Sequence, residues 1–168
     1  GAVTASQVLA MAFFEDGKWA QAFPAFGAER RGSPAMSFVR VDKKPILIRS
    51  QVYHPQYALV LDPTLLDAVN VCKGMECCGF VIVNTKHDIG EMHVVNKYTI
   101  DLDTIAMKVI GRKFVNLAML GAFSAVSGAV SMKAISKAIR LRMGPKVAEK
   151  NTKAAKMAHN MVKKEVST

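Results

Sequence analysis

The sequence contains few of the residues from which cross-linked or metal-binding sites are built. It has 3 cysteines in 168 residues, Cys72, Cys77 and Cys78, in the pattern C-x4-C-C. Adjacent cysteines on a strand point to opposite sides, and no second pair completes a tetrahedral zinc site. Four thiolates at ferredoxin-like spacing, which an iron–sulfur cluster needs, are also missing. We therefore expect free thiols in a reducing cytoplasm, and no metal bound by this chain.

Catalytic motifs are equally scarce. The sequence has no G-x-S-x-G turn, no intact phosphate-binding P-loop and no histidine pair at helical spacing. Its histidines are scattered, and we expect them to be structural or solvated: His54, His87, His93 and His159. Asp101-x-Asp103 resembles a metal-binding pair, but a helix cap followed by a first-turn acid explains both carboxylates. The sequence therefore predicts no complete catalytic set.

A secretory signal and a convincing membrane span are not evident. The first residues carry neither a basic region nor a cleavage site. The longest uncharged run lies between Lys113 and Lys133, but Asn116 and several serines and glycines interrupt it. We predict a buried helix that ends near Gly128, not a segment that crosses a bilayer. With 51% hydrophobic and 21% charged residues, the composition indicates a globular, soluble protein.

Strand and helix patterns alternate over most of the chain. An apolar stripe predicts a helix over residues 4–14, and Asp101 and Gly111 are typical of the start and stop of a helix between them. Apolar or alternating runs predict strands over residues 18–23, 36–41, 46–48, 57–61, 80–83 and 98–100. Asp62-Pro63 predicts a further helix start, with Leu65, Leu66 and Val69 on its buried side. Asn84 follows a buried strand, where open α/β sheets usually bind ligands. We therefore predict an α/β fold, a single three-layer α/β/α domain with a mixed β-sheet over residues 1–168.

The end of the chain is strongly basic. Two amphipathic helices separated by Gly144-Pro145 are predicted, with apolar stripes formed by Met132, Ile135 and Ile139 and then by Val147, Asn151, Ala154, Ala155, Ala158, Met161 and Val162. The net charge is +10, and Glu149 is the one acid between Lys133 and Lys164. Such a surface binds either nucleic acid or an acidic partner subunit. No aromatic residue that could stack on bases follows Lys133, so the partner subunit is favoured.

A charged loop stands out near the start of the chain. In the stretch PAFGAERRGSPAMSFVR, residues 24–40, Gly27 and Gly32 enclose Glu29, Arg30 and Arg31. Glycines allow the backbone to approach a ligand closely, and paired guanidinium groups suit phosphate or carboxylate oxygens. Alternatively, the loop is a solvated turn in which the arginines pair with Glu29. Chemistry alone leaves both interpretations open.

Four stretches together resemble the gamma subunit of the 2-oxoacid:ferredoxin oxidoreductases, most closely the pyruvate type. FGAERRGSPAMSFVRVDKKPI is similar to the hallmark segment of that family. The other stretches agree in order and spacing: GAVTASQVLA at the start, YALVLDPTLL at 57–66 and NLAMLGAF at 116–123. In the family, a strand and a Gly-Gly-Gln-Gly segment precede this point. We therefore expect Gly1 to be the last glycine of a loop whose remainder is absent.

The resemblance implies a supporting subunit that is inactive alone. Enzymes of this family oxidatively decarboxylate a 2-oxoacid on thiamine diphosphate with magnesium, reduce ferredoxin through iron–sulfur clusters and transfer the acyl group to coenzyme A. The thiamine diphosphate and the clusters belong to the alpha, beta and ferredoxin-like delta subunits. The resemblance also implies a coenzyme A site, for which we expect Gly1, Arg30, Arg31 and Asn116 to bind phosphate. An equivalent subunit for indolepyruvate, 2-oxoglutarate or a branched-chain 2-oxoacid remains an alternative, as does a basic nucleic-acid-binding module.

Overall fold

The computed structural model describes residues 1–25, 34–92 and 96–166, and the side chains as far as Lys164. The chain begins with α1 (Ala2–Glu15), which packs against a two-stranded antiparallel sheet of β1 (Trp19–Pro24) and β2 (Ser37–Asp42). Trp19 lies opposite Asp42, and Pro24 lies opposite Ser37. The apolar stripe predicted for the first helix is buried on this packing face, as Val8, Leu9, Ala12 and Phe13 show.

A second, parallel sheet has the order β3-β4-β5, with β3 at Tyr57–Val60, β4 at Phe80–Asn84 and β5 at Asn96–Ile100. The central strand β4 is buried along its whole length, which explains its continuous apolar sequence. The short helix α2 (Leu65–Ala68) connects β3 to β4. Helix α3 (Leu102–Val109) follows β5 directly, and Asp101 caps it by accepting a hydrogen bond from the Thr104 backbone N–H at 2.9 Å.

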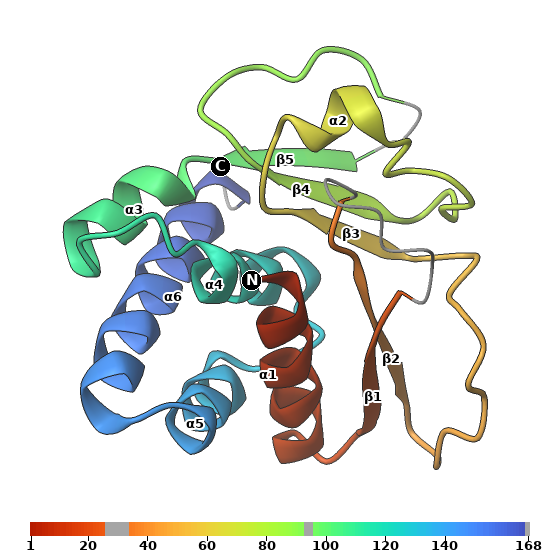
Figure 1. Cartoon of the computed structure of the whole chain (residues 1–168), viewed down its shortest axis with the longest axis horizontal. Coiled ribbons are helices and arrows are strands. Elements are labelled where there is room, and N and C mark those ends of the chain that lie inside the picture. The colour runs from red at the N-terminus through yellow and green to blue at the C-terminus, as the bar shows by residue number, and fades with distance from the viewer. Residues whose placement is uncertain (26–33, 93–95, 167–168) are drawn as a thin grey trace.

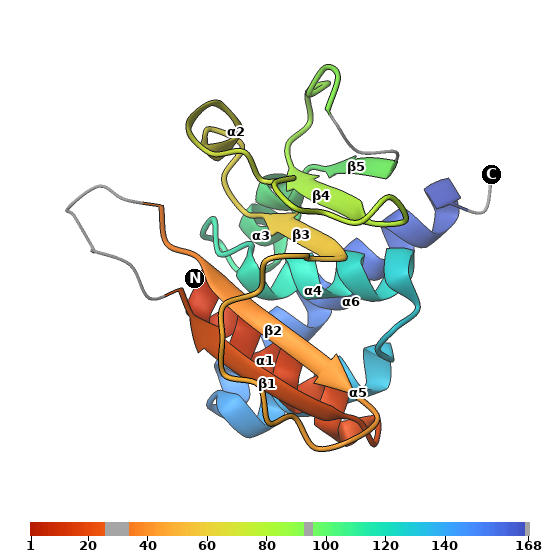
Figure 2. The same cartoon turned by 90° about the vertical axis from the view of Figure 1, so that its right-hand side faces the viewer.

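Three helices complete the fold: α4 (Asn116–Ser127), α5 (Met132–Arg142) and α6 (Pro145–Val166). Helix α4 lies in the interior, between the parallel sheet, α1 and α6 (Figures 1 and 2). Phe123 on α4 joins these layers, because its ring centroid lies 6.4 Å from that of Phe13 on α1 and 6.1 Å from that of Phe80 on β4. Gly128 ends α4 with a φ of 60°, as its position in the sequence predicted.

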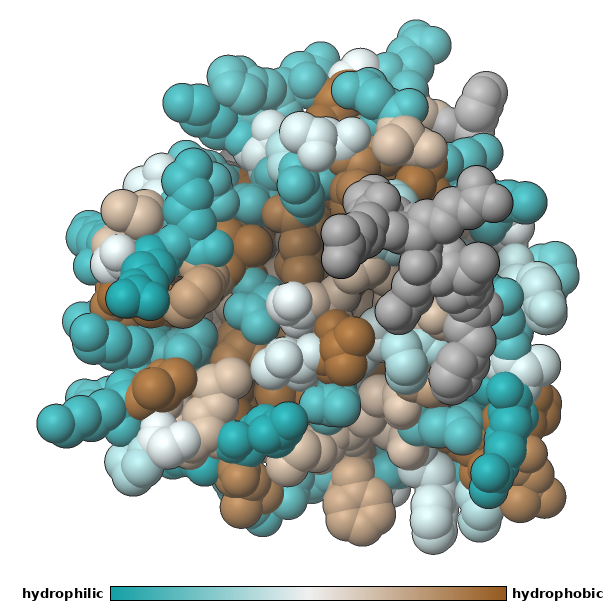
Figure 3. All heavy atoms as spheres, in the orientation of Figure 1, coloured by the Kyte–Doolittle hydropathy of each residue, from teal (hydrophilic) through white to brown (hydrophobic). Residues whose placement is uncertain are grey.

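The predicted α/β class is confirmed, and both parallel and antiparallel strands are present. The described strands form two separate sheets, because β2 and β3 are not paired with each other and no other described strand joins the two sheets. Figure 3 shows hydrophilic and hydrophobic residues interspersed on one face of the molecule. None of the described helices is both long enough and apolar enough to cross a bilayer.

The strand predicted over residues 46–48 is wrong. The chain there is irregular, and Leu47 and Ile48 are 87% and 59% exposed. The Arg40 guanidinium donates hydrogen bonds to the carbonyl oxygens of Ile48, at 3.1 Å, and Ser50, at 2.9 Å. A side chain therefore holds the carbonyl oxygens of Ile48 and of Ser50 just beyond this segment, where a strand would need a neighbouring backbone.

Three smaller predictions also need correction. The helix predicted from Asp62 contains only four residues, and the apolar side chains on its inner side are half-buried. On α6, Val147 and Met161 are exposed, while the other residues of the predicted stripe are buried. The cysteines at 77 and 78 lie in a turn before β4, not on a strand. For the two helices, local periodicity did not reveal which apolar side chains the neighbouring segments leave exposed.

Candidate functional site

The first residues of two helices meet at one edge of the molecule. Gly1 precedes α1 and Asn116 begins α4, and the Asn116 side-chain amide donates a hydrogen bond to the Gly1 carbonyl oxygen at 3.4 Å. A β-carbon placed on Gly1 would lie 3.5 Å from the Asn116 β-carbon. Figure 1 shows the N-terminus beside α4. The structure therefore brings together two of the four residues predicted to bind coenzyme A.

Both helix starts favour an anion. Neither α1 nor α4 has a side-chain cap, and neither has an acidic residue in its first turn. The first backbone N–H groups of a helix lack intrahelical acceptors, and the helix dipole adds partial positive charge at that end. Phosphate and carboxylate groups bind to helix N-termini for this reason.

The charged loop is anchored to the same edge. The Ser37 hydroxyl lies 2.7 Å from that of Ser6 on α1, and it donates to the Phe23 carbonyl oxygen at 3.0 Å. The Ala25 N–H donates to the Met36 carbonyl oxygen at 3.0 Å, so the two ends of the loop are paired. Glu29, Arg30 and Arg31 lie outside the described residues. The structure thus places the base of their loop beside α1 but not the guanidinium groups themselves.

Asn84 has a structural role at the end of β4. Its amide donates to the Leu61 carbonyl oxygen at 3.1 Å and to Asp103 Oδ1 at 3.0 Å, and its oxygen accepts from the Leu102 N–H at 2.9 Å. Asp103 also forms a salt bridge with Lys113 at 3.0 Å. The hydrogen bond from Asn84, followed by that from Lys113, lowers the pKa of Asp103. Neighbouring elements therefore satisfy the polar groups at this strand end.

The described part of the chain contains no cluster of side chains that could bind a metal ion. No group of three or more histidine, cysteine or acidic side chains converges there on one point. Asp101 and Asp103 have separate partners, since Asp101 accepts from Thr104 and Asp103 interacts with Asn84 and Lys113. His54 Nδ1 lies 3.3 Å from the Gly74 carbonyl oxygen, whereas His93 lies outside the described residues.

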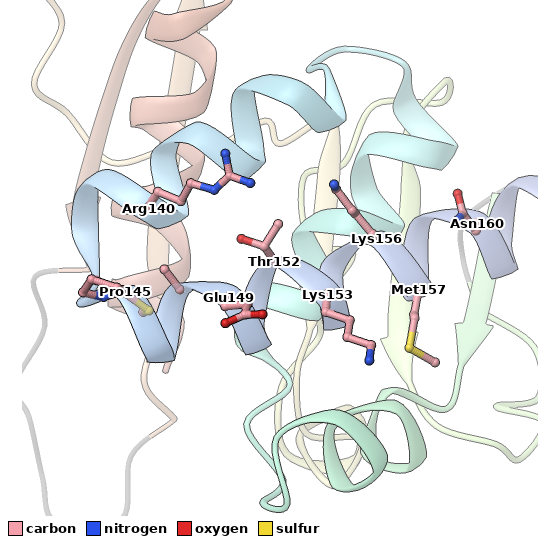
Figure 4. A pocket seen from close by; sticks show the side chains of 10 residues that line it. Arg140, Pro145, Glu149, Thr152, Lys153, Lys156, Met157 and Asn160 are labelled. Carbon is pink, nitrogen blue, oxygen red and sulfur yellow. The ribbon is translucent and has the colours of Figure 1, made fainter.

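A groove of about 690 Å³ lies between α5 and α6, and the sequence did not indicate it. Arg140, Lys153 and Lys156 are among its lining residues (Figure 4). Thr152 also lines it, and its buried hydroxyl oxygen has no hydrogen-bond partner among the described residues. The groove shares no residue with the Gly1–Asn116 edge. Glu149, Thr152 and Lys156 follow one side of α6, and this polar spacing is the signal in the sequence from which the groove could have been predicted.

Comparison with known proteins shows the class of this chain. The family model described as pyruvate ferredoxin/flavodoxin oxidoreductase matches residues 1–161. Pyruvate synthase subunit PorC of Methanocaldococcus jannaschii is 50% identical over 165 residues, which are 98% of this chain and 92% of that protein. The common gamma subunit of the pyruvate/ketoisovalerate oxidoreductases of Pyrococcus furiosus is 44% identical, over 95% of this chain and 89% of that protein.

Comparison with solved structures points to the same family. The crystal structure of pyruvate oxidoreductase subunit PORC from Thermotoga maritima has a TM-score of 0.80 and 34% sequence identity, covering 95% of this chain and 89% of that one. The chain is thus a gamma-type subunit of an oxidoreductase complex. It belongs to the pyruvate ferredoxin/flavodoxin oxidoreductase family. The resemblance noted from the charged loop and its accompanying stretches is confirmed.

Proposed function

We propose that this chain is the gamma subunit of a thiamine-diphosphate-dependent pyruvate:ferredoxin oxidoreductase. The complex would decarboxylate pyruvate oxidatively, reduce ferredoxin and form acetyl-coenzyme A. The 50% identity to a pyruvate synthase subunit over 98% of the chain is the observation that carries this proposal. Thiamine diphosphate with magnesium and the iron–sulfur clusters would be held by the alpha, beta and delta subunits. The gamma chain would contribute to assembly and to the coenzyme A site.

Gly1, Asn116 and the charged loop form the proposed coenzyme A edge. Coenzyme A carries a diphosphate and a 3′-phosphate, and uncapped helix starts offer backbone N–H donors to such groups. The hydrogen bond from Asn116 to Gly1 is long at 3.4 Å, so the Asn116 amide can turn toward a phosphate at little cost. Arg30 and Arg31 would add bidentate donors from the loop, whose base is held beside α1 by Ser37.

The test measures coenzyme A dependence in the assembled complex. A hydrogen bond to a charged group contributes about 1.5–3 kcal/mol, so Arg30→Ala or Arg31→Ala should raise the KM for coenzyme A by roughly one to two orders of magnitude. Asn116→Ala should raise it less, because its amide is neutral. Decarboxylation of pyruvate in a single turnover without coenzyme A should be nearly unchanged, and lysine should rescue each arginine site only partly.

Arg112→Ala is the control, because Arg112 is an exposed arginine in the segment between α3 and α4 and does not belong to the charged loop. If both loop variants assemble normally and use coenzyme A like the parent, the arginines belong to a solvated turn. If a correctly assembled complex does not oxidise pyruvate at any of the coenzyme A concentrations tested, that result instead contradicts pyruvate as the substrate.

The second candidate is a gamma subunit shared between two oxidoreductases. The Pyrococcus furiosus relative, at 44% identity, is a common subunit of pyruvate and ketoisovalerate oxidoreductases. Affinity purification of this chain from its own cells would distinguish the two cases. One set of partner subunits and activity with pyruvate alone support the first candidate. Two sets of partners, with activity on both pyruvate and 2-oxoisovalerate, support the second.

The basic helices α5 and α6 would face another subunit. Lys137 forms a salt bridge with Glu15 on α1 but is still exposed, as are Arg140, Arg142, Lys150 and Lys153. A positively charged face speeds association with an acidic partner. Titration with duplex DNA and with RNA at physiological salt should show weak, sequence-independent binding at most, because counterion release acts on any basic surface. Tight, sequence-selective binding would favour the nucleic-acid-binding alternative.

A further inference from the structure

Two neighbouring thiols lie together on the surface of the turn before β4. Cys77 and Cys78 are both exposed, and their sulfur atoms are 3.7 Å apart. On a strand these side chains would point to opposite sides, as the sequence had suggested. The turn instead directs both sulfur atoms to the same place. The third cysteine, Cys72, is half-buried, and burial raises the pKa of its thiol.

The backbone on either side of this pair is held by the segment that precedes β3. The Glu76 N–H donates to the Pro55 carbonyl oxygen at 3.3 Å, and the Phe80 N–H donates to that of Gln56 at 3.1 Å. A β-carbon on Gly79 would lie 2.4 Å from the same Gln56 oxygen, so only glycine fits this close approach. The turn is therefore fixed at both ends while the two sulfur atoms remain accessible.

We propose that Cys77 and Cys78 form a redox-active dithiol that is oxidised by low-molecular-weight disulfides. The thiolate of one of the two cysteines attacks one sulfur of the small disulfide, forming a mixed disulfide and releasing one small thiolate. The other cysteine then loses its proton, and its thiolate attacks the Sγ of the first and displaces the second small thiolate. The two protein thiols are oxidised to one disulfide, and the small disulfide is reduced to two thiols.

The contact between the sulfur atoms also affects the ionisation of the pair. A hydrogen bond with Cys77, and then the charge of a Cys77 thiolate, raise the pKa of Cys78. Because the thiolate is the nucleophile in thiol–disulfide exchange, one cysteine attacks the small disulfide, and the other, whose sulfur lies 3.7 Å away, resolves the mixed disulfide.

A disulfide at this site would be easily reversed. Adjacent α-carbons are about 3.8 Å apart, whereas disulfides usually join α-carbons separated by roughly 4.4–6.8 Å. The closed ring is therefore strained, and strained, exposed disulfides are the reducible ones. The pair suits a reversible switch and not a permanent cross-link.

The first experiment treats the full chain with 2-hydroxyethyl disulfide and follows its intact mass. The parent and the matched control Cys72→Ser should each lose the mass of two hydrogen atoms, and peptide mapping should locate the bond between Cys77 and Cys78. Cys77→Ser should form a stable mixed disulfide on Cys78, and Cys78→Ser one on Cys77. The proposal is contradicted if the parent instead forms a stable mixed disulfide at both Cys77 and Cys78, or if the protein disulfide involves Cys72.

The second experiment uses phenylarsine oxide, which bridges two neighbouring thiols, as a probe of the reduced pair. One equivalent should protect both exposed thiols of the parent and of Cys72→Ser from a chromogenic thiol reagent. In Cys77→Ser and Cys78→Ser, the remaining exposed thiol should react at least tenfold faster than in the treated parent. Equal protection of the single variants would show that the two sulfur atoms do not act as a pair.

Discussion

Gly121 on α4 lies directly against the backbone of Ala155 on α6, so that a β-carbon at position 121 would be 1.9 Å from the Ala155 carbonyl oxygen. This contact lies in the core, where Ala154, Ala155 and Ala158 of α6 are all fully buried. Small residues on both helices allow their backbones to approach closely. The glycine is therefore required by the crossing of α4 and α6, although glycine inside a helix is intrinsically unfavourable.

We expect Gly121→Ala to destabilise the fold. Alanine favours the helical state by about 1 kcal/mol, but the added methyl group has no space, and overpacking of a core typically costs about 1–3 kcal/mol or more. Urea unfolding should therefore show a lower free energy for the variant. Gly144→Ala is the control, because a β-carbon there would meet no atom within 4 Å. Equal stability of Gly121→Ala and the parent would mean that α6 moves away easily.

The buried amide of Asn84 gives a second prediction. Asn84→Ala removes the acceptor of the Leu102 N–H and the donor to the Leu61 carbonyl oxygen, both with hydrogen bonds near 3 Å. Leaving such buried groups unsatisfied costs roughly 1–3 kcal/mol, so the free energy of unfolding should fall by about that amount. The control is Asn70→Ala, which removes a hydrogen bond to the Cys72 N–H within an exposed turn. The prediction fails if the two variants are equally stable.

Features set by local chemistry could be predicted from the sequence. Asp101 caps α3, and Gly111, with a φ of 82°, follows its end, because capping and chain reversal depend on residues within one turn. The same holds for Gly128 at the end of α4. The buried strand β4 was also predicted, because a short continuous apolar run is typical of a strand that is covered on both faces.

Features that depend on residues distant in the sequence could not be predicted in this way. Residues 46–48 are as apolar as a strand, but a strand also needs a pairing partner, and the Arg40 side chain instead holds the carbonyl oxygens of Ile48 and Ser50. Asn84 was correctly placed at a strand end, whereas its bond to Asp103 depends on how β4 and α3 meet. Likewise the resemblance pointed to Gly1 and Asn116 separately, and only the packing of α1 against α4 shows that they touch.

The stability of the Asp101 cap should depend on pH. Hydrogen bonds from the Thr104 hydroxyl and then from the Thr104 N–H lower the pKa of Asp101. Because the folded pKa lies below the unfolded value near 4, the cap stabilises the fold at pH values above that range, and the contribution is lost as the pH falls through the folded pKa.

Thr104→Val removes the hydroxyl donor and tests this dependence. At pH 6 the variant should be less stable than the parent by about 0.5–1 kcal/mol, a small value because the pair is partly exposed to solvent. The difference between the two proteins should shrink as the pH falls below the unfolded pKa, which is about 4, and through the lower folded pKa. Thr99→Val, an exposed change on β5, should show no such trend. A difference that stays constant with pH would show that the valine acts through helix propensity and not through the carboxylate.

The last prediction concerns the link between the end of α1 and the start of α5. One carboxylate oxygen of Asp16 accepts a hydrogen bond from the Ser131 N–H at 2.6 Å, and the other accepts from the Ser131 hydroxyl at 2.7 Å. Ser131 is itself the cap of α5, where its hydroxyl accepts from the Ala134 N–H at 3.1 Å. The Asp16 charge thus lies at the positive end of α5, which favours it through the helix dipole.

Asp16→Ala should lower the free energy of unfolding by about 1–2 kcal/mol, and Asp16→Asn by less, since an amide keeps one acceptor oxygen. Asp42→Ala is the control, because the hydrogen bond that the Asp42 side chain accepts from the Lys44 N–H is local, and its loss should cost at most about 0.5 kcal/mol. A double-mutant cycle with Ser131→Ala should give a coupling energy of at least about 0.5 kcal/mol, because the two side chains share a hydrogen bond. Strictly additive effects in urea unfolding would mean that Asp16 and Ser131 stabilise their own helices independently.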